Sequence, residues 1–233
     1  MATIILVHGA FQGDWVWDKI TPTLRAAGHT VYSPTLQGLG SRASELTQQT
    51  GLQDHIADVC KVIDENNASE IILLGHSYGG IVISGVAKVR TLHIKKILYL
   101  DAPIPDNNQS LLDVLGADTA QFFYNSAHEG WRIDSFPAQA FGLDKEKDIA
   151  WAFPQHTPQS LKTFTDKVSM LQPSEMSSIK IGYILCTPGN VFTQTQALKA
   201  QKQGWDTHQI QAGHCPMITD AKAFADLLCK SIL

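Results

Sequence analysis

The feature that most constrains this 233-residue sequence is an alternation of short, β-branched apolar runs with longer amphipathic segments. Helical patterns follow several of the runs, over 52–66 and 78–89, and a last one begins at about Ala221. Such units build a mostly parallel sheet flanked by helices, because each crossover helix covers a face of the sheet. The sequence therefore predicts a single α/β domain over residues 1–233. Its expected strands are 3–7, 30–33, 71–74, 96–100, 180–186 and 207–211.

The alternation stops after the strand that ends at about Leu100. The segment 104–178 is rich in aromatic residues and proline and shows no regular strand and helix pattern. A structureless loop of this length is uncommon inside a compact domain. We therefore predict a helical cap over 104–178, inserted within the domain and lying over the sheet.

Composition narrows the classes of partner. The formal net charge is -4, and no block of like charges favours nucleic acid or an anionic membrane. The apolar runs are far shorter than the ~20 residues of a membrane helix, and no secretory signal is visible at the N-terminus. Four cysteines without paired spacing favour reduced thiols in the cytoplasm and no metal site. We expect a small-molecule ligand; a homodimer is compatible with the sequence, which specifies no oligomeric state.

The segment 71–80 reads IILLGHSYGG, an apolar strand followed by G-x-S-x-G and a helix. In this context the motif holds a serine on a sharp turn at the carboxyl end of a strand, with the helix N-terminus beside it. The pattern predicts Ser77 as a nucleophile. The alternative is an ordinary Gly-Ser turn of a strand-helix unit.

Two further segments end strands with a glycine and a histidine. After the first strand, His8-Gly9-Ala10 would let the backbone N–H of Ala10 join that of Tyr78 in an oxyanion hole, in which each donor is typically worth ~3 kcal/mol of barrier. Near the C-terminus, Gly213-His214 precedes the last helix, where this fold places its general base. We predict His214 as the base. The other eight histidines are interpreted as turn, surface or packing residues.

The segments 8–17, 75–80 and 213–217 together resemble the small-ester branch of the α/β-hydrolase superfamily, which holds plant methylesterases, hydroxynitrile lyases and bacterial carboxylesterase relatives. The resemblance implies a capped esterase fold, catalysis by Ser77 and His214, and no cofactor. Lyases of this branch carry threonine where this chain has Gly9, and lysine where it has Cys215. Both polar groups are missing here, which favours ester hydrolysis over cyanohydrin cleavage.

The acid of the triad is the main departure from the family pattern. The family usually places it just after the strand at 181–187, but Pro188-Gly189-Asn190 offers no carboxylate. The best substitute is Asp101, directly after the strand that ends at Leu100, because active-site groups gather at the carboxyl ends of parallel strands. The alternatives are that Asp101 is a turn residue and that Asn190 orients the histidine.

These residues predict a serine carboxylesterase that hydrolyses small methyl, aromatic or terpenoid esters through an acyl-enzyme. We name Phe11, Phe122 and Trp131 as substrate-binding residues, although aromatic residues at helical spacing are as often ordinary core. Two alternatives stay open. One is a ligand-binding receptor on a hydrolase scaffold, and the other is a hydroxynitrile lyase or thioesterase that uses the same serine.

Overall fold

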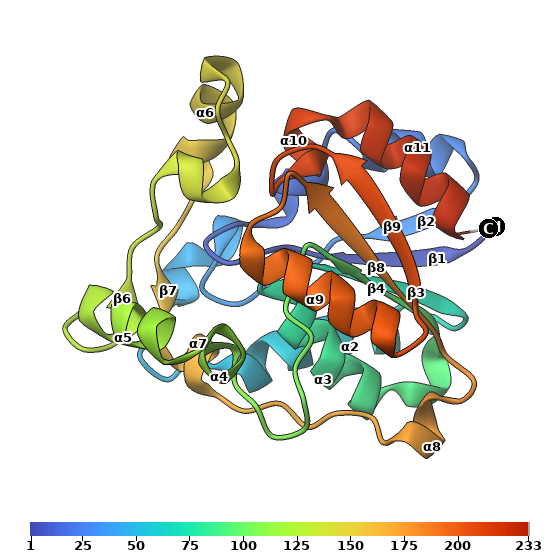
Figure 1. Cartoon of the computed structure of the whole chain (residues 1–233), viewed down its shortest axis with the longest axis horizontal. Coiled ribbons are helices and arrows are strands. Elements are labelled where there is room, and N and C mark those ends of the chain that lie inside the picture. The colour runs from blue at the N-terminus through green and yellow to red at the C-terminus, as the bar shows by residue number, and fades with distance from the viewer. Residues whose placement is uncertain (233) are drawn as a thin grey trace.

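The computed structural model, which describes residues 1–232, contains a six-stranded sheet with the strand order β2-β1-β3-β4-β8-β9 (Figure 1). Every neighbouring pair in this sheet is parallel. The predicted α/β fold with a parallel sheet and flanking helices is therefore confirmed. The strands are β1 (Thr3–Val7), β2 (Thr30–Tyr32), β3 (Ile71–His76), β4 (Ile94–Leu100), β8 (Lys180–Thr187) and β9 (Asp206–Gln211).

Helices cover both faces of the sheet. Figure 1 shows α2, α3 and α9 below the strands, and α10 and α11 above them. The N-terminal helix α1 contacts α11, and α2 contacts α3. The helices outside the insertion are α1 (Thr21–Ala26), α2 (Leu52–Glu65), α3 (Gly79–Val89), α9 (Val191–Lys202), α10 (Pro216–Thr219) and α11 (Ala221–Ile232), with 3-10 turns η1 (Asp14–Trp17), η2 (Gly40–Glu45) and η3 (Thr91–His93). Among residues 1–232, every helix is too short or too polar to span a bilayer.

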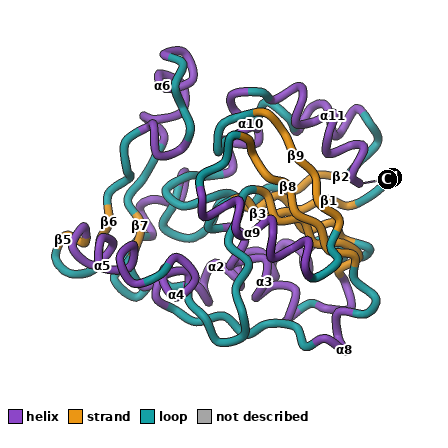
Figure 2. The backbone as a smooth tube through the Cα atoms, viewed as in Figure 1, coloured by secondary structure: helices purple, strands orange, loops and turns teal. Residues whose placement is uncertain are grey.

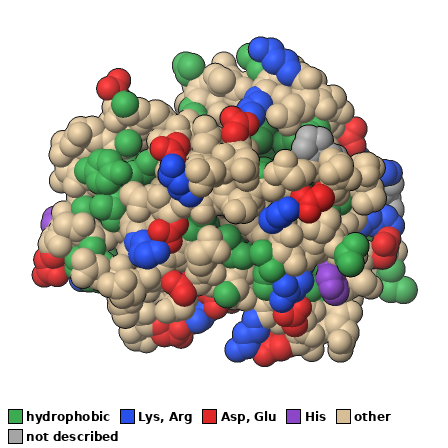
Figure 3. All heavy atoms as spheres, turned by 90° about the horizontal axis from the view of Figure 1, so that it is seen from below, with side chains coloured by type: hydrophobic (Ala, Val, Ile, Leu, Met, Phe, Trp, Pro, Cys, Tyr) green, Lys and Arg blue, Asp and Glu red, His purple; other side chains and the backbone are tan. Residues whose placement is uncertain are grey.

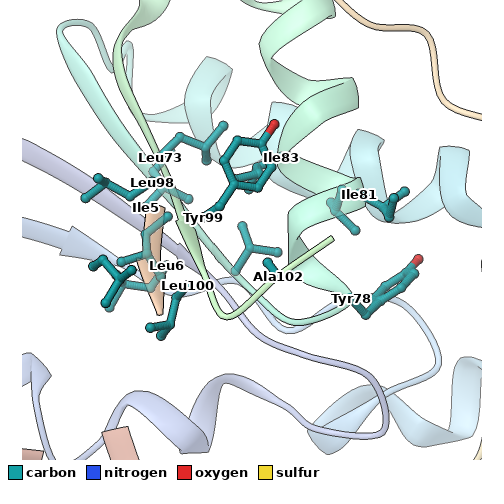
Figure 4. Close-up of a cluster of buried hydrophobic side chains, with 14 of the residues drawn as sticks. Ile5, Leu6, Leu73, Tyr78, Ile81, Ile83, Leu98, Tyr99, Leu100 and Ala102 are labelled. Atoms are coloured by element: carbon teal, nitrogen blue, oxygen red, sulfur yellow. The ribbon is translucent and has the colours of Figure 1, made fainter. Parts of the chain in front are cut away.

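The core lies between the central strands and the helices. Strand β3 is buried at every position, which explains why its apolar run shows no alternation of polar and apolar residues. Figure 4 gathers core side chains from three neighbouring strands and from α3, among them Leu6, Leu73, Leu98 and Ile83. The central strands therefore form the most enclosed part of the molecule.

The strand order also fixes where a site can form. From β1 the chain moves to one side, into β2, and then returns to place β3 on the other side of β1. Loops at such a reversal diverge and leave a crevice at the carboxyl ends of the strands. The loop after β1 begins at His8, and the loop after β3 holds Ser77.

The segment between β4 and β8 has its own short elements, most of which lie to the left of the sheet in Figure 1, whereas its last helix, α8, lies at the lower right. Besides helices it contains a three-stranded antiparallel sheet, β5-β6-β7, which the sequence pattern did not predict because its strands are only two residues long (Figure 2). The elements are α4 (Leu111–Leu115), α5 (Ala117–Ser126), β5 (Ala127–His128), β6 (Arg132–Ile133), η4 (Ala138–Phe141), α6 (Glu146–Ala152), η5 (Phe153–Gln155), β7 (Gln159–Ser160), α7 (Lys162–Thr165) and α8 (Pro173–Met176). This segment, 104–178, is called the insertion below.

Candidate active site

Ser77 occupies a sharp turn between β3 and α3. Its φ of +52° lies in the left-handed region, which a residue with a side chain rarely adopts. The backbone N–H of Ser77 donates to the carbonyl oxygen of Leu100 at 3.1 Å, so the neighbouring strand holds the turn. The serine is half-buried, and its hydroxyl has no hydrogen-bond partner within residues 1–232, which leaves it free to rotate into the cavity.

The glycines on either side of Ser77 are required by close contacts. A β-carbon on Gly75 would lie 2.5 Å from the carbonyl oxygen of Gly79, and one on Gly79 would lie 2.7 Å from the carbonyl oxygen of Val7. Both distances are shorter than real contacts allow. The motif therefore lets β3, α3 and the end of β1 approach one another closely enough to share a site.

His214 and Asp101 form a hydrogen-bonded pair. Nδ1 of His214 lies 2.7 Å from Oδ2 of Asp101. Because a carboxylate accepts a hydrogen bond, Nδ1 carries the proton. In the neutral ring the lone pair of Nε2 is then free to act as a base. The other oxygen of Asp101 accepts the backbone N–H of Cys186 at 3.1 Å, and the side chain is almost fully buried.

Asn190, the alternative partner for the histidine, is used elsewhere. Its Oδ1 accepts the backbone N–H of Thr193 at 2.9 Å and so caps the first turn of α9. The structure thus brings Asp101, and not Asn190, into hydrogen-bond contact with His214.

Ala10 and Tyr78 border the same cavity as Ser77. Their backbone N–H groups find no acceptor within the described chain, as an oxyanion hole requires. The side chain of Tyr78 is anchored, since its hydroxyl lies 2.7 Å from Nδ1 of His55. The other nitrogen of His55 is 2.9 Å from the carbonyl oxygen of Gln37 and must donate to it, so Tyr78 is the donor to His55. Burial lowers the pKa of His55 to about 4, which keeps its ring neutral.

His76 contacts the loop that carries His214. The sequence had suggested only a turn, surface or packing role for His76. Its Nε2 lies 2.8 Å from the backbone carbonyl oxygen of His214, and the two rings lie 4.7 Å apart. Burial, with the nearby His214, holds the pKa of His76 well below its ordinary value. The only signal in the sequence was its place next to the serine.

The cavity beside these groups has a volume of about 190 Å³. Its aromatic lining comes mainly from the insertion and consists of Phe11, Tyr78, Phe123, Phe136, Phe141, Phe164 and Phe192. Phe11, one of the three residues named as substrate-binding, lines the cavity. Phe122 and Trp131 do not line the cavity within the described chain: Phe122 is 54% exposed, whereas its neighbour Phe123 is 8% exposed and faces inward.

Exposed apolar side chains gather on the left of Figure 3, the side on which Figure 1 places the insertion. Phe122 and Tyr124 of α5 are among the exposed large hydrophobic residues of the chain. Helix α5 thus turns Phe123 toward the cavity and its neighbours Phe122 and Tyr124 toward solvent.

The cysteines take no part in this arrangement as nucleophiles. All four are free thiols, and Cys215, next to His214, is fully buried. Burial raises the pKa of Cys215 to about 12. A thiol of this kind packs as a small apolar group. Within residues 1–232, no group of three or more His, Cys, Asp or Glu side chains could hold a metal ion.

Comparison with known proteins identifies the class. Residues 4–227 match the alpha/beta hydrolase family, and the chain belongs to it. It is 33% identical, over 242 aligned residues and 98% of both chains, to a carbendazim hydrolyzing esterase from a Nocardioides species. It is 27% identical to salicylic acid-binding protein 2 of Nicotiana tabacum, covering 98% of this chain and 95% of that one.

The fold is also found in solved structures. An extracellular alpha/beta-hydrolase from a Paenibacillus species superposes with a TM-score of 0.87 at 23% identity, covering 99% of this chain and 98% of that one. Because a relative that matches 98% of this chain is named an esterase, the protein is a carboxylic ester hydrolase of this family.

Proposed function

We propose that the protein is a serine carboxylesterase that hydrolyses small esters through an acyl-enzyme on Ser77. One observation carries the proposal: the hydrogen-bonded pair of Asp101 and His214 borders the same cavity as Ser77 and the two free N–H groups of Ala10 and Tyr78. These are the groups that acyl transfer needs: a nucleophile, an oriented base and donors for the oxyanion.

The reaction begins when Nε2 of His214 takes the proton of Ser77 as its oxygen attacks the ester carbonyl carbon. The negative charge moves onto the carbonyl oxygen, where the N–H groups of Ala10 and Tyr78 stabilise it. His214 then gives its proton to the leaving alcohol. Water, deprotonated by the same histidine, releases the acid and restores the serine, while Asp101 stabilises the imidazolium in each half-reaction.

The cavity supports a compact, uncharged substrate. Within the described chain its lining holds no lysine or arginine, and its walls are mostly apolar. We propose that the insertion acts as the cap that closes this cavity, because it contributes Phe123, Phe136 and Phe164 to the walls. A methyl, aromatic or terpenoid ester matches this chemistry.

Two features weigh against the other candidate functions. The receptor hypothesis was based on the missing acid at 188–190, and Asp101 supplies a carboxylate 2.7 Å from His214. The lyase hypothesis needs a cation beside the histidine, and this chain has the buried thiol of Cys215 there.

The free cysteines support a reducing, cytoplasmic location, which cell fractionation would test.

The test is steady-state hydrolysis of p-nitrophenyl acetate by the wild type and by Ser77→Ala. We expect kcat to fall by about 10⁵-fold or more, because loss of the nucleophile removes the acyl-enzyme route. The control is Ser84→Ala, which changes a buried serine of α3 whose hydroxyl donates to the carbonyl oxygen of Gly80 at 2.7 Å. Its activity should stay within a few-fold of wild type.

A second measurement follows the covalent intermediate itself. A fluorophosphonate probe should label the wild type on the peptide that contains Ser77, and the alanine variant should not be labelled. Wild-type turnover in the folded Ser77→Ala variant would refute the proposal.

A further inference from the structure

The loop after β1 contains a residue in an unusual backbone conformation. Phe11 directly follows Ala10, and its φ of +64° lies in the left-handed region. A bulky side chain rarely occupies this region, so the surrounding structure has to hold the residue there. The conformation of Phe11 determines how the adjoining backbone of Ala10 faces the cavity.

Both backbone groups of Phe11 are bonded to the insertion. Its N–H donates to Oε1 of Gln159 at 2.9 Å, across 148 residues of sequence. Its carbonyl oxygen accepts the N–H of Thr157, also at 2.9 Å. The loop that carries Ala10 is therefore fixed by residues at and just before β7.

The Gln159 side chain has only one orientation that satisfies its neighbours. It is fully buried, and its Nε2 lies 2.8 Å from Oγ1 of Thr163. The Thr163 hydroxyl donates its hydrogen to the carbonyl oxygen of Ser160 at 2.7 Å, so its oxygen must accept the hydrogen bond from Gln159. The amide nitrogen thus faces Thr163, and the amide oxygen faces Phe11.

We propose that Gln159 is a positioning residue for the oxyanion hole. By accepting the N–H of Phe11 it holds the left-handed turn, and the turn aims the N–H of Ala10 at the substrate carbonyl oxygen. Gln159 does not line the cavity and touches no reacting atom, so it acts only through this loop. The inference rests on the proposed acyl transfer at Ser77, in which Ala10 is an oxyanion donor.

The test uses Gln159→Met, which keeps the length of the side chain and removes the acceptor. The matched control is Gln196→Met. Gln196 is also a buried glutamine, and its Oε1 accepts a backbone N–H, that of Ile104, at 2.9 Å, but it lies on α9 and away from the oxyanion loop.

We expect Gln159→Met to lower kcat for p-nitrophenyl acetate by about 10- to 100-fold, with KM within about three-fold of wild type, because a misaligned donor acts mainly in the transition state. The inhibition constant of a phenyl trifluoromethyl ketone, which forms a tetrahedral oxyanion on the serine, should rise by a similar factor. A merely structural role would not couple these two measurements.

If Gln159→Met does not fold, Thr163→Val is measured in its place. It keeps the shape of the side chain and removes the group that orients the amide of Gln159, and it should show the same coupling with a smaller amplitude. Changes in kcat and ketone inhibition no larger than those of Gln196→Met would overturn the inference while Ser77-dependent turnover persists. Turnover that survives Ser77→Ala would overturn the proposed function and the inference together.

Discussion

The loops that follow β3 and β4 differ from the loop that follows β1 in how they are supported. The first two each begin with a residue at positive φ, Ser77 at +52° and Asp101 at +45°. In each case the backbone N–H of that residue donates to the next strand of the same sheet, Ser77 to Leu100 at 3.1 Å and Asp101 to Ile184 at 2.8 Å. The proposed nucleophile and the proposed acid are thus held within the most buried part of the molecule.

The loop after β1 also contains a residue at positive φ, but its support comes from elsewhere. Both backbone groups of Phe11 bond to the insertion, through Gln159 and Thr157. One half of the proposed machinery is therefore fixed by the sheet, and the other half by the segment that also lines the cavity. We therefore expect substitutions in the insertion to change the rate of the chemical step as well as the affinity for substrate.

The largest effect should come from the half held by the sheet. We expect Asp101→Asn to lower kcat by about 10⁴-fold, because an amide in this position favours the wrong tautomer of the histidine. Asn190→Ala removes the cap of α9 and a side chain that borders the cavity, and it should leave kcat within a few-fold and lower stability by about 1 kcal/mol. Steady-state kinetics and urea denaturation of both variants check this, and the reverse order of the two kcat values would assign the orienting role to Asn190.

Acid should loosen the side of the site that holds the oxyanion loop. Burial lowers the pKa values of His8 and His55 to about 4, below the value of 6.5 for an exposed histidine. The unfolded chain then binds more protons than the folded one between about pH 6.5 and 4, so stability is lost as the pH falls through this window. Each of the two histidines should account for a loss of about 3 kcal/mol in the free energy of unfolding as the pH falls from 6.5 to 4.

The measurement is the free energy of unfolding in urea at pH 7 and pH 4.5, for the wild type and His8→Gln. The variant should show a smaller loss between the two pH values, because one buried neutral imidazole is gone. An equal loss in both proteins would mean that His8 is not held neutral in the folded state.

The smallest effects should separate the two faces of the insertion. Phe136 lines the cavity, and we expect Phe136→Ala to raise KM for an aromatic ester several-fold through lost apolar contact. Phe122 is 54% exposed, and Phe122→Ala should change KM less than two-fold. Similar KM values for the two variants would show that Phe136 does not contact the substrate.

The centre of the sheet was predictable because its inner strands are buried on both faces and leave continuous apolar runs, as in β3. The proposed sites of Ser77, Asp101 and His214 followed from the same pattern, since each lies just beyond the carboxyl end of a strand. For the acid, sequence reasoning left Asp101 and Asn190 open, because only a distance to the histidine distinguishes them.

The insertion was less predictable for physical reasons. A strand of two residues, such as β7, is too short to show a period, so the small sheet and the role of Gln159 had no local signal. In α5 the neighbours Phe122 and Phe123 have the same chemistry, and only packing decides which of them faces the cavity. Contacts across 148 residues, such as that of Gln159 with Phe11, are properties of the fold and of no single segment.

The position of Asp101 has a consequence for how this enzyme can diverge. Because the proposed acid, Asp101, follows β4, the turn from Pro188 to Asn190 carries no carboxylate that the proposed reaction needs, yet Asn190 and Phe192 border the cavity. We expect that mutation of residues beside this turn can change the substrate while the hydrogen bond between Asp101 and His214 stays intact. In directed evolution, a library that randomises 190–192 should yield a high fraction of active clones, provided that Gly189 is kept, because a β-carbon there would lie 2.7 Å from the carbonyl oxygen of Cys186.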